Sequence, residues 1–222
     1  MKPNPSISFS CDFISKLDIN ISTVLDIGVK SQTLELKKFF KDKKQILIEP
    51  QKSYNELIES NYKGIDYTIE NSACTNYNGE MYLHEEYLWD SKTPTHNYVS
   101  KKKSKVKVKT KTLDTICNEF AVNKWSLLKI DVDGEEINIL KSGLNSLENF
   151  CFIIVECVVE RFTSINQILT ENGFSLFHIT DISYIENMMS QFDSVYVNKK
   201  FKGMDNLLHP TFNIETWHRH IP

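Results

Sequence analysis

The stretch WSLLKIDVDGEEINILKSGL, residues 125–144, determines the predicted fold. It opens with a short apolar run that contains one lysine, and Asp131 and Asp133 follow two positions apart. Gly134 then precedes a segment whose apolar residues have helical spacing. This order predicts a buried strand, a turn that carries carboxylates, and a helix. Ligands of open α/β sheets bind beyond the carboxyl ends of the strands, so Asp131 is the first candidate site residue.

The composition describes a globular domain. The chain has 222 residues, of which 41% are hydrophobic and 25% charged, and this is enough to bury a sizeable core. A net charge of -3 argues against a nucleic-acid partner for the whole domain. The five cysteines are widely spread and never spaced as C-x-x-C, which favours a reducing, cytoplasmic location. No segment has the order of a signal peptide or the length of a membrane span.

Strands alternate with helices along the whole sequence, and this alternation predicts an α/β doubly wound sheet. The expected strands are residues 23–29, 45–50, 65–73, 80–84, 106–108, 125–130, 150–159, 174–180 and 194–198. We divide the chain into an N-terminal lead-in over residues 1–22, a domain over residues 23–200 and a C-terminal tail over residues 201–222. Residues 85–105 lack a clear period and predict a loop or insertion near the acceptor side of the site.

Acidic residues stand at the ends of four predicted strands. Asp26 closes the first strand, Glu49 the second, Asp131 and Asp133 the central one, and Glu156 lies in the most apolar one. An acid at the end of a second strand binds ribose hydroxyls in nucleotide-binding α/β folds. A carboxylate at the central strand would face a cationic group or a hydroxyl. S-adenosylmethionine, which has a ribose and a positive charge, fits this pattern better than a dinucleotide.

Each acid also has a structural alternative. Asp26 would bond neighbouring turn amides, and Glu49 would be solvated. Asp133 would be the N-cap of the next helix, with Glu136 completing a capping box. Glu156 favours a site role instead, because a lone carboxylate in so apolar a strand is costly unless it has a partner.

The central segment resembles a known family. Residues 127–140, LLKIDVDGEEINIL, are similar to the K-I-D-V-E-G-x-E-x-x-V-L motif of the FkbM family of S-adenosylmethionine-dependent methyltransferases. Further matches are Glu49-Pro50 at the second strand, Ala73 with Asn78-Gly79 at the third, Leu113-Asp114 upstream of the motif, and Glu156. The resemblance covers roughly residues 23–198 in order.

This resemblance implies a Rossmann-like class I methyltransferase with a mostly parallel seven-stranded sheet, an antiparallel last strand and helices on both faces. It implies S-adenosylmethionine as cofactor and a hydroxyl acceptor, often on a sugar or glycan. Asp26 and Gly28 would form the first cofactor loop, and Glu49 would hold the ribose hydroxyls. Asn71, Ser72 and Ala73 would lie near the adenine. Asp131 would bind the cofactor's ammonium or the substrate hydroxyl.

The first loop departs from the family pattern. The family has D-x-G-A-N-x-G, whereas residues 26–32 read D-I-G-V-K-S-Q and keep one glycine. A second departure is Asp133, where the family usually has Glu. The altered loop motivates an alternative from another class, a non-catalytic binding or assembly module that retains the sheet. A third alternative, an NAD-dependent sugar-modifying enzyme, requires a dinucleotide to bind.

Transfer of a methyl group to a hydroxyl needs a positioned oxygen and a base. The candidate catalytic residues are Asp133, Glu156 and His178, although His178 is equally explained as a core histidine. An oxygen-rich Mg²⁺ site at Asp131, Asp133 and Glu156 is an alternative that we place below a metal-free mechanism. The acceptor is expected to be a small molecule or glycan.

The insertion and the lysines after it have two interpretations each. Tyr87, Trp89, His96 and Tyr98 would form a stacking lid for a sugar ring or a small satellite core. Residues 101–111, KKKSKVKVKTK, contain seven lysines. They would grip an anionic group near the acceptor, or protect an exposed edge strand from pairing with another sheet, which is the interpretation we prefer.

Overall fold

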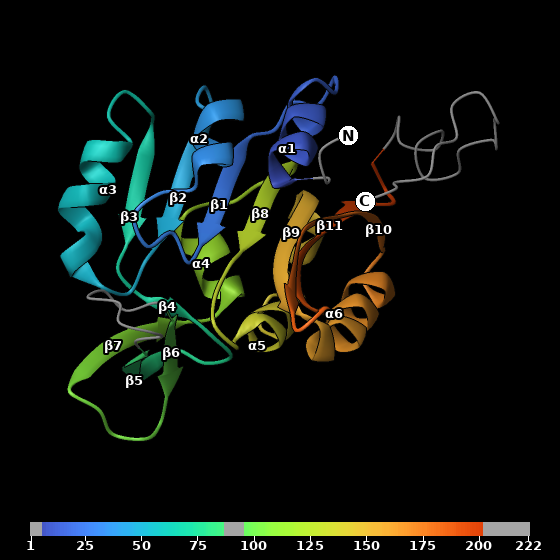
Figure 1. Ribbon diagram of the computed structural model, residues 1–222. Coiled ribbons are helices and arrows are strands. Elements are labelled where there is room, and N and C mark those ends of the chain that lie inside the picture. The colour runs from blue at the N-terminus through green and yellow to red at the C-terminus, as the bar shows by residue number, and fades with distance from the viewer. Residues whose placement is uncertain (1–5, 87–95, 202–222) are drawn as a thin grey trace.

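The computed structural model describes residues 6–86 and 96–201. A large sheet forms its centre, with helices on both faces, and a smaller sheet lies beneath the ends of strands β1 (Thr23–Ile27), β2 (Lys44–Ile48) and β8 (Ser126–Ile130) (Figure 1). The smaller sheet therefore stands beside the carboxyl ends of parallel strands, where sites form in this fold class.

The central sheet has seven strands in the order β10-β11-β9-β8-β1-β2-β3. The strands not yet given are β3 (Tyr67–Glu70), β9 (Phe150–Val158), β10 (Phe174–Ile185) and β11 (Met188–Asn198). Strand β11 is antiparallel to β9 and β10, and the pairs from β9 to β3 are parallel. The predicted seven-stranded, mostly parallel sheet with an antiparallel last strand is confirmed.

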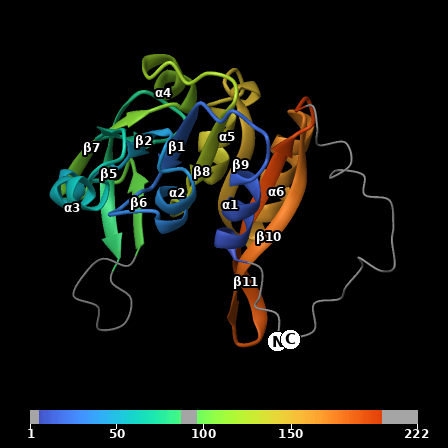
Figure 2. The same ribbon diagram turned by 90° about the horizontal axis from the view of Figure 1, so that it is seen from above.

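Two apolar clusters cover the two faces of this sheet. Along β8, Leu127 packs with helices α1 (Ile7–Ser15) and α2 (Leu34–Phe39), whereas Leu128 packs with α4 (Leu113–Glu119), α5 (Glu136–Lys141) and α6 (Val159–Glu171). Figure 2 shows α4 on one side of the strands and α1 and α2 on the other. The alternation follows from the two-residue period of a strand. Helix α3 (Asn55–Asn61) packs on Leu47 of β2, and two 3-10 turns span Lys52–Tyr54 and Leu147–Asn149.

Part of the stretch expected to be a loop or insertion, residues 85–105, belongs to strands of a smaller sheet. Its strands are β4 (Ala73–Cys74), β5 (Gly79–Glu86), β6 (His96–Ser100) and β7 (Val106–Lys111), in the order β4-β7-β5-β6. Strand β6 forms because Val99 pairs with Leu83 and packs on the small core of this sheet. The strand expected over residues 65–73 is divided between the two sheets, as β3 and the start of β4.

The lysine-rich strand is an edge strand only in part. Strand β7 pairs with β5 over residues 106–110 and with β4 at Thr110 and Lys111. Val108 is buried, whereas Lys107 is exposed and pairs with Glu80 at 2.5 Å. Of the predicted aromatic lid, Tyr87 and Trp89 lie outside the described residues, as does the tail from residue 202.

The last hairpin is longer than expected. Strands β10 and β11 extend to Ile185 and Met188, and their tip projects well beyond the sheet (Figure 2). Glu186 and Asn187 at the tip have φ angles of 48° and 66°, which suit a two-residue turn between twisted strands. In the part of the chain that the structure describes, no helix has the length and apolar character needed to cross a membrane.

Candidate active site

A cavity of about 260 Å³ opens at the carboxyl ends of β1, β2 and β8. A second cavity of about 410 Å³ adjoins it, toward α5 and α6. Tyr98, Asp133, Glu156 and Gln191 line both of them. The two cavities therefore lie side by side and share part of their lining.

Most of the predicted site residues line the first cavity. These are Gly28, Glu49, Ser72, Ala73, Asp131, Asp133 and Glu156. Three do not line either cavity, namely Asp26, Asn71 and His178. The sequence therefore located the cavity, while these three side chains have other surroundings.

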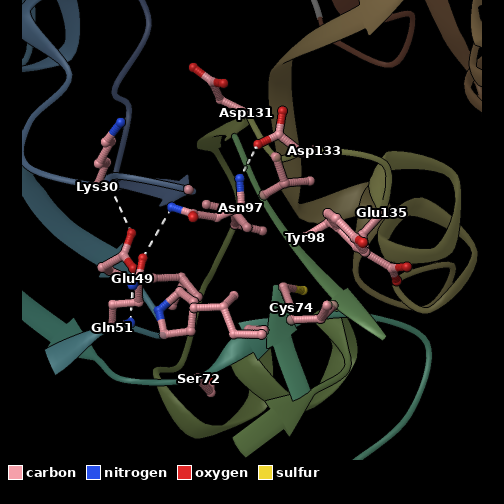
Figure 3. Close-up of a pocket in the computed structure, with 18 of the residues that line it drawn as sticks. Lys30, Glu49, Gln51, Ser72, Cys74, Asn97, Tyr98, Asp131, Asp133 and Glu135 are labelled. Atoms are coloured by element: carbon pink, nitrogen blue, oxygen red, sulfur yellow. Dashed lines mark hydrogen bonds between the residues drawn. The ribbon is translucent and has the colours of Figure 1, made fainter. Parts of the chain in front are cut away.

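Glu49 stands at the end of β2 and is held by backbone amides. Its carboxylate accepts hydrogen bonds from the N–H groups of Lys30 at 2.8 Å and Gln51 at 2.9 Å (Figure 3). The residue is 4% exposed, so the solvated alternative is wrong. Burial raises the pKa of Glu49 to about 7, although the two amides act in the opposite direction. A carboxylate that is fixed and poorly hydrated is well prepared to accept hydroxyl donors.

The first loop closes without its second glycine. Gly28 has a φ of 91° and Lys30 a φ of 52°, whereas Gln32 is not among the residues with positive φ. A side chain at position 32 is therefore compatible with the backbone of the loop. The hydrogen bond from the backbone N–H of Lys30 to the Glu49 carboxylate holds the loop against the end of β2.

Asp26 lies behind the cavity rather than in it. It is fully buried, and neither carboxylate oxygen has a hydrogen-bond partner among the described residues. The alternative in which Asp26 bonds turn amides is therefore wrong. Burial raises the pKa of Asp26 to about 6, and the charge of the nearby Lys129 ammonium limits the rise.

Of the three residues after β3, one supports the end of β2 and two line the cavity. Asn71 donates to the carbonyl oxygen of Glu49 at 2.9 Å and to Asn55 at 3.0 Å, so it braces the end of β2. Ser72 and Ala73 line the cavity. The Ser72 hydroxyl is buried and has no partner among the described residues. It is a polar group available to a ligand.

Asp131 directly follows β8, and Glu156 lies near the carboxyl end of the neighbouring strand β9. The carboxylate of Asp131 is paired with the Lys129 ammonium and keeps 40% of its side chain exposed. Burial, followed by the charge of Asp131 and a hydrogen bond with it, raises the pKa of Glu156 to about 8. At neutral pH the Glu156 carboxyl is therefore mostly protonated.

Asp133 is hydrogen-bonded to strand β6 of the smaller sheet. Its carboxylate accepts the N–H of Asn97 at 2.7 Å (Figure 3). Helix α5 starts at Glu136 with Glu135 as its N-cap, and no side chain caps it. The predicted capping box of Asp133 and Glu136 is therefore wrong, and Glu136 instead pairs with Arg161 at 3.2 Å.

His178 lies under α1. Its Nδ1 is 2.9 Å from the Ser10 hydroxyl, and its ring is 4.0 Å from that of Phe177 and 5.6 Å from that of Phe9. Burial lowers its pKa. This is the core histidine of the structural alternative, and a catalytic role for it stays an untested prediction.

Comparison with known proteins identifies the family. The profile of the methyltransferase FkbM domain matches residues 26–176, about two thirds of the chain. The chain belongs to the FkbM methyltransferase family. The resemblance of residues 127–140 to the family motif is thereby confirmed. No curated protein matches the sequence.

Solved methyltransferases share the fold of this FkbM protein. An rRNA methylase from Streptococcus thermophilus is 9% identical, with a TM-score of 0.52 over 89% of this chain and 98% of that one. A candidate methyltransferase from Streptococcus mutans, in complex with SAH, is 10% identical, with a TM-score of 0.51 over 89% and 99% of the two chains. At this identity the likeness establishes the class I, Rossmann-like fold.

The residues of the first cavity fit S-adenosylmethionine, the cofactor of the FkbM family. The fixed Glu49 carboxylate suits ribose hydroxyls, and the Ser72 hydroxyl is an unused polar group on the wall. Asn97 adds a buried amide oxygen without a partner among the described residues. The part of the chain that the structure describes contains no group of three or more His, Cys, Asp or Glu side chains able to hold a metal ion, so the Mg²⁺ alternative gains no support.

Several site residues of the FkbM protein escaped the sequence analysis. Asn97 donates to Gln51 at 3.1 Å and so joins β6 to the end of β2. It lies in the region expected to be a loop, and no local pattern marked it. Lys129 could have been found from the sequence, because it is the one charged residue in the apolar run of residues 125–130. Asp193 of β11 lies opposite Glu156.

Proposed function

We propose that this protein is an S-adenosylmethionine-dependent O-methyltransferase that acts on a hydroxyl of a sugar, glycan or related small molecule. One observation carries the proposal. The carboxyl of Glu156 lines both the cavity that Glu49 lines and the second cavity, and the neighbouring Asp131 lines the first. A proton acceptor is thus placed between the two molecules that would react.

The first cavity would hold the cofactor. Glu49 would accept hydrogen bonds from the two ribose hydroxyls, and Ser72 and Ala73 would lie near the adenine. When bound, S-adenosylmethionine supplies a methyl group made electrophilic by the sulfonium. Asp131, which is still 40% exposed in its side chain, would orient the cofactor's ammonium or the acceptor.

The second cavity would hold the acceptor, with Glu156 as the base. The ionised form of Glu156 would accept the proton of an acceptor hydroxyl, whose oxygen would take the methyl group that the cofactor supplies when bound. Positioning of the oxygen in line with that bond supplies much of the rate. We prefer Glu156 to Asp133 as the base because Asp133 is engaged by the Asn97 amide.

Other observations support the choice of acceptor and compartment. The polar groups that line the second cavity include Asp133, Glu135 and Glu156, which accept hydrogen bonds from hydroxyls. A net charge of -3 supports a small-molecule or glycan acceptor over nucleic acid. All five cysteines are buried and free, which supports a cytoplasmic location.

Calorimetry with S-adenosylmethionine and S-adenosylhomocysteine tests the cofactor assignment. We expect binding of both, and loss of binding in Glu49→Gln. Absence of heat with either ligand would instead favour the alternative function, a non-catalytic binding or assembly module, which the altered first loop motivates.

A transfer assay tests the reaction. Sugars, glycosides and single-stranded RNA are incubated with cofactor labelled in its methyl group, and the label is followed by mass spectrometry. Label on a sugar oxygen supports the proposal. Label on RNA, or on nitrogen or carbon, contradicts it. Mass spectrometry of the protein as purified would show whether an adenosyl compound remains bound.

A further inference from the structure

Lys129 is a buried charge in the centre of the sheet. It lies on β8 between β1 and β9, is 4% exposed, and does not line either cavity. Lysine is rarely buried to this extent unless its ammonium is paired. The ammonium pairs with Asp131, two residues further along the same strand. Removing a lysine ammonium from water costs free energy, so packing alone does not explain a lysine in a core strand.

The strand register places further carboxylates on the same face. Lys129 lies beside Asp26 of β1, and Glu156 of β9 lies beside Asp193 of β11. Alternation along the strands puts these side chains on the face that Leu127 and Val195 share with α1. This acidic row, defined as Asp26, Asp131, Glu156 and Asp193, surrounds one lysine.

The charges of the acidic row act on one another. Glu156 is affected by Asp131 and Asp193, which favour its protonated form, and by Lys129, which favours its ionised form. The titratable groups that face this region from the packed elements are Asp26 on β1, Lys129 and Asp131 on β8, Asp193 on β11, Asp181 on β10, Glu35 on α2 and Cys11 on α1. Lys129 is the one cation among them.

We propose that Lys129 is a positioning residue of the methyl transfer: it anchors the Asp131 carboxylate and supplies the buried positive charge that stabilises the ionised, proton-accepting form of Glu156. The inference rests on the proposed function and adds a residue that touches neither cofactor nor acceptor. Without the lysine, the carboxyls of the acidic row would be left without a counter-charge, and Glu156 would keep its proton up to a higher pH than in the wild type.

Titration of Glu156 tests the proposal without any substrate. The full chain is prepared with ¹³C-labelled glutamate carboxyls, the Glu156 signal is assigned with Glu156→Gln, and its midpoint is followed by NMR. In the wild type the expected pKa of Glu156 is about 8. Lys129→Met should raise the midpoint by about one pH unit or more, because an opposite charge at short range is lost. Lys129→Arg, which keeps the charge, should restore it.

Lys107→Met is the matched control. It removes the same charge from an exposed lysine on β7, so it should leave the Glu156 midpoint in place. A folded Lys129→Met protein whose Glu156 midpoint equals that of the wild type would overturn the proposal. If Lys129→Met does not fold, Asp131→Asn provides the second test. There the midpoint should fall, because the neighbouring carboxylate is removed, and an unchanged midpoint would also overturn the proposal.

A pH–rate profile separates this proposal from the proposed function. If methyl transfer is observed, Lys129→Met should shift the rise of kcat to higher pH, by the same amount as the NMR midpoint, and Lys129→Arg should shift it back. A lysine with a purely structural role would lower kcat without moving the profile. Absence of cofactor binding or methyl transfer, with the NMR shift present, would reject the reaction and retain the electrostatic role.

Discussion

Gly28 and Asp131 are in backbone contact. A β-carbon built on Gly28 would lie 1.8 Å from the carbonyl oxygen of Asp131, and the N–H of Asp131 donates to the carbonyl oxygen of Ile27 at 2.9 Å. The first loop is thus packed directly on the turn that carries the acids. The glycine retained from the family pattern is required by this contact, whether or not a cofactor is bound.

Gly28→Ala should therefore destabilise the protein strongly. Gly64→Ala is the matched control, because Gly64 has a similar φ of 84° and no atom within 4 Å of the added carbon. The control should lose about 1–2 kcal/mol from its strained backbone alone. Gly28→Ala should lose about 1–3 kcal/mol more, because two backbone segments must separate. Urea unfolding measures both values, and equal losses would show that the contact is unimportant.

Glu49→Gln should weaken the binding of S-adenosylhomocysteine by about 10- to 100-fold, the effect of losing charged hydrogen bonds of about 1.5–3 kcal/mol. Glu59→Gln is the control, since Glu59 is exposed on α3 and distant from the cavity lining. Calorimetry gives both dissociation constants. Equal affinities for wild type and Glu49→Gln would remove Glu49 from the cofactor site.

Binding of S-adenosylhomocysteine should release protons near pH 7. The pKa of Glu49 is about 7 in the free protein, so the carboxyl is about half protonated there. Ribose hydroxyls donate to the ionised form and would lower this pKa, which releases about half a proton per ligand. Calorimetry in phosphate and in Tris, which differ in ionisation enthalpy, detects the release. It should vanish in Glu49→Gln, and proton uptake in the wild type would contradict the assignment.

The convergence of acids was predictable because it depends on local pattern. Glu49 and Asp131 directly follow apolar strands and Glu156 lies near the end of one, and the carboxyl ends of parallel strands meet at one edge of a sheet. The periodic spacing of hydrophobic residues therefore predicted both the strands and the edge of the sheet at which the acidic side chains gather. The sequence also indicated Lys129, as a single charge inside a core strand, although not its partner.

Site residues whose position depends on the pairing of strands far apart in the sequence could not be predicted. Asn97 enters the site because β6 pairs with β5 across a connection, and its own segment has no period that marks a strand. Asp193 fell just outside the strand expected over residues 194–198, and its place beside Glu156 follows from the antiparallel register of β11. The helix cap, offered as the structural alternative for the catalytic candidate Asp133, is wrong because its carboxylate accepts the N–H of Asn97, a partner that spacing along the chain cannot reveal.

The stability of the protein should fall as the pH rises from 6.5 to 8.0. In the native state the pKa values of Glu49 and Asp193 are about 7 and that of Glu156 is about 8, all raised chiefly by burial above ordinary values near 4. At pH values between the ordinary pKa near 4 and the native pKa near 7 or 8, the native state binds more protons than the unfolded state. The stability that these three carboxyls contribute is therefore complete below about pH 4 and is lost as the pH rises through 7 and 8.

Asp193→Asn removes one of these titrating groups, so it should reduce the loss of stability between pH 6.5 and 8.0 by about 1 kcal/mol. Asp26→Asn is the matched control, because the pKa of Asp26 is about 6 and most of its titration is complete below this window. Its loss of stability should stay close to that of the wild type. Urea unfolding at the two pH values measures each difference. A wild type that is more stable at pH 8.0 would show that these carboxyls are already ionised in the native state.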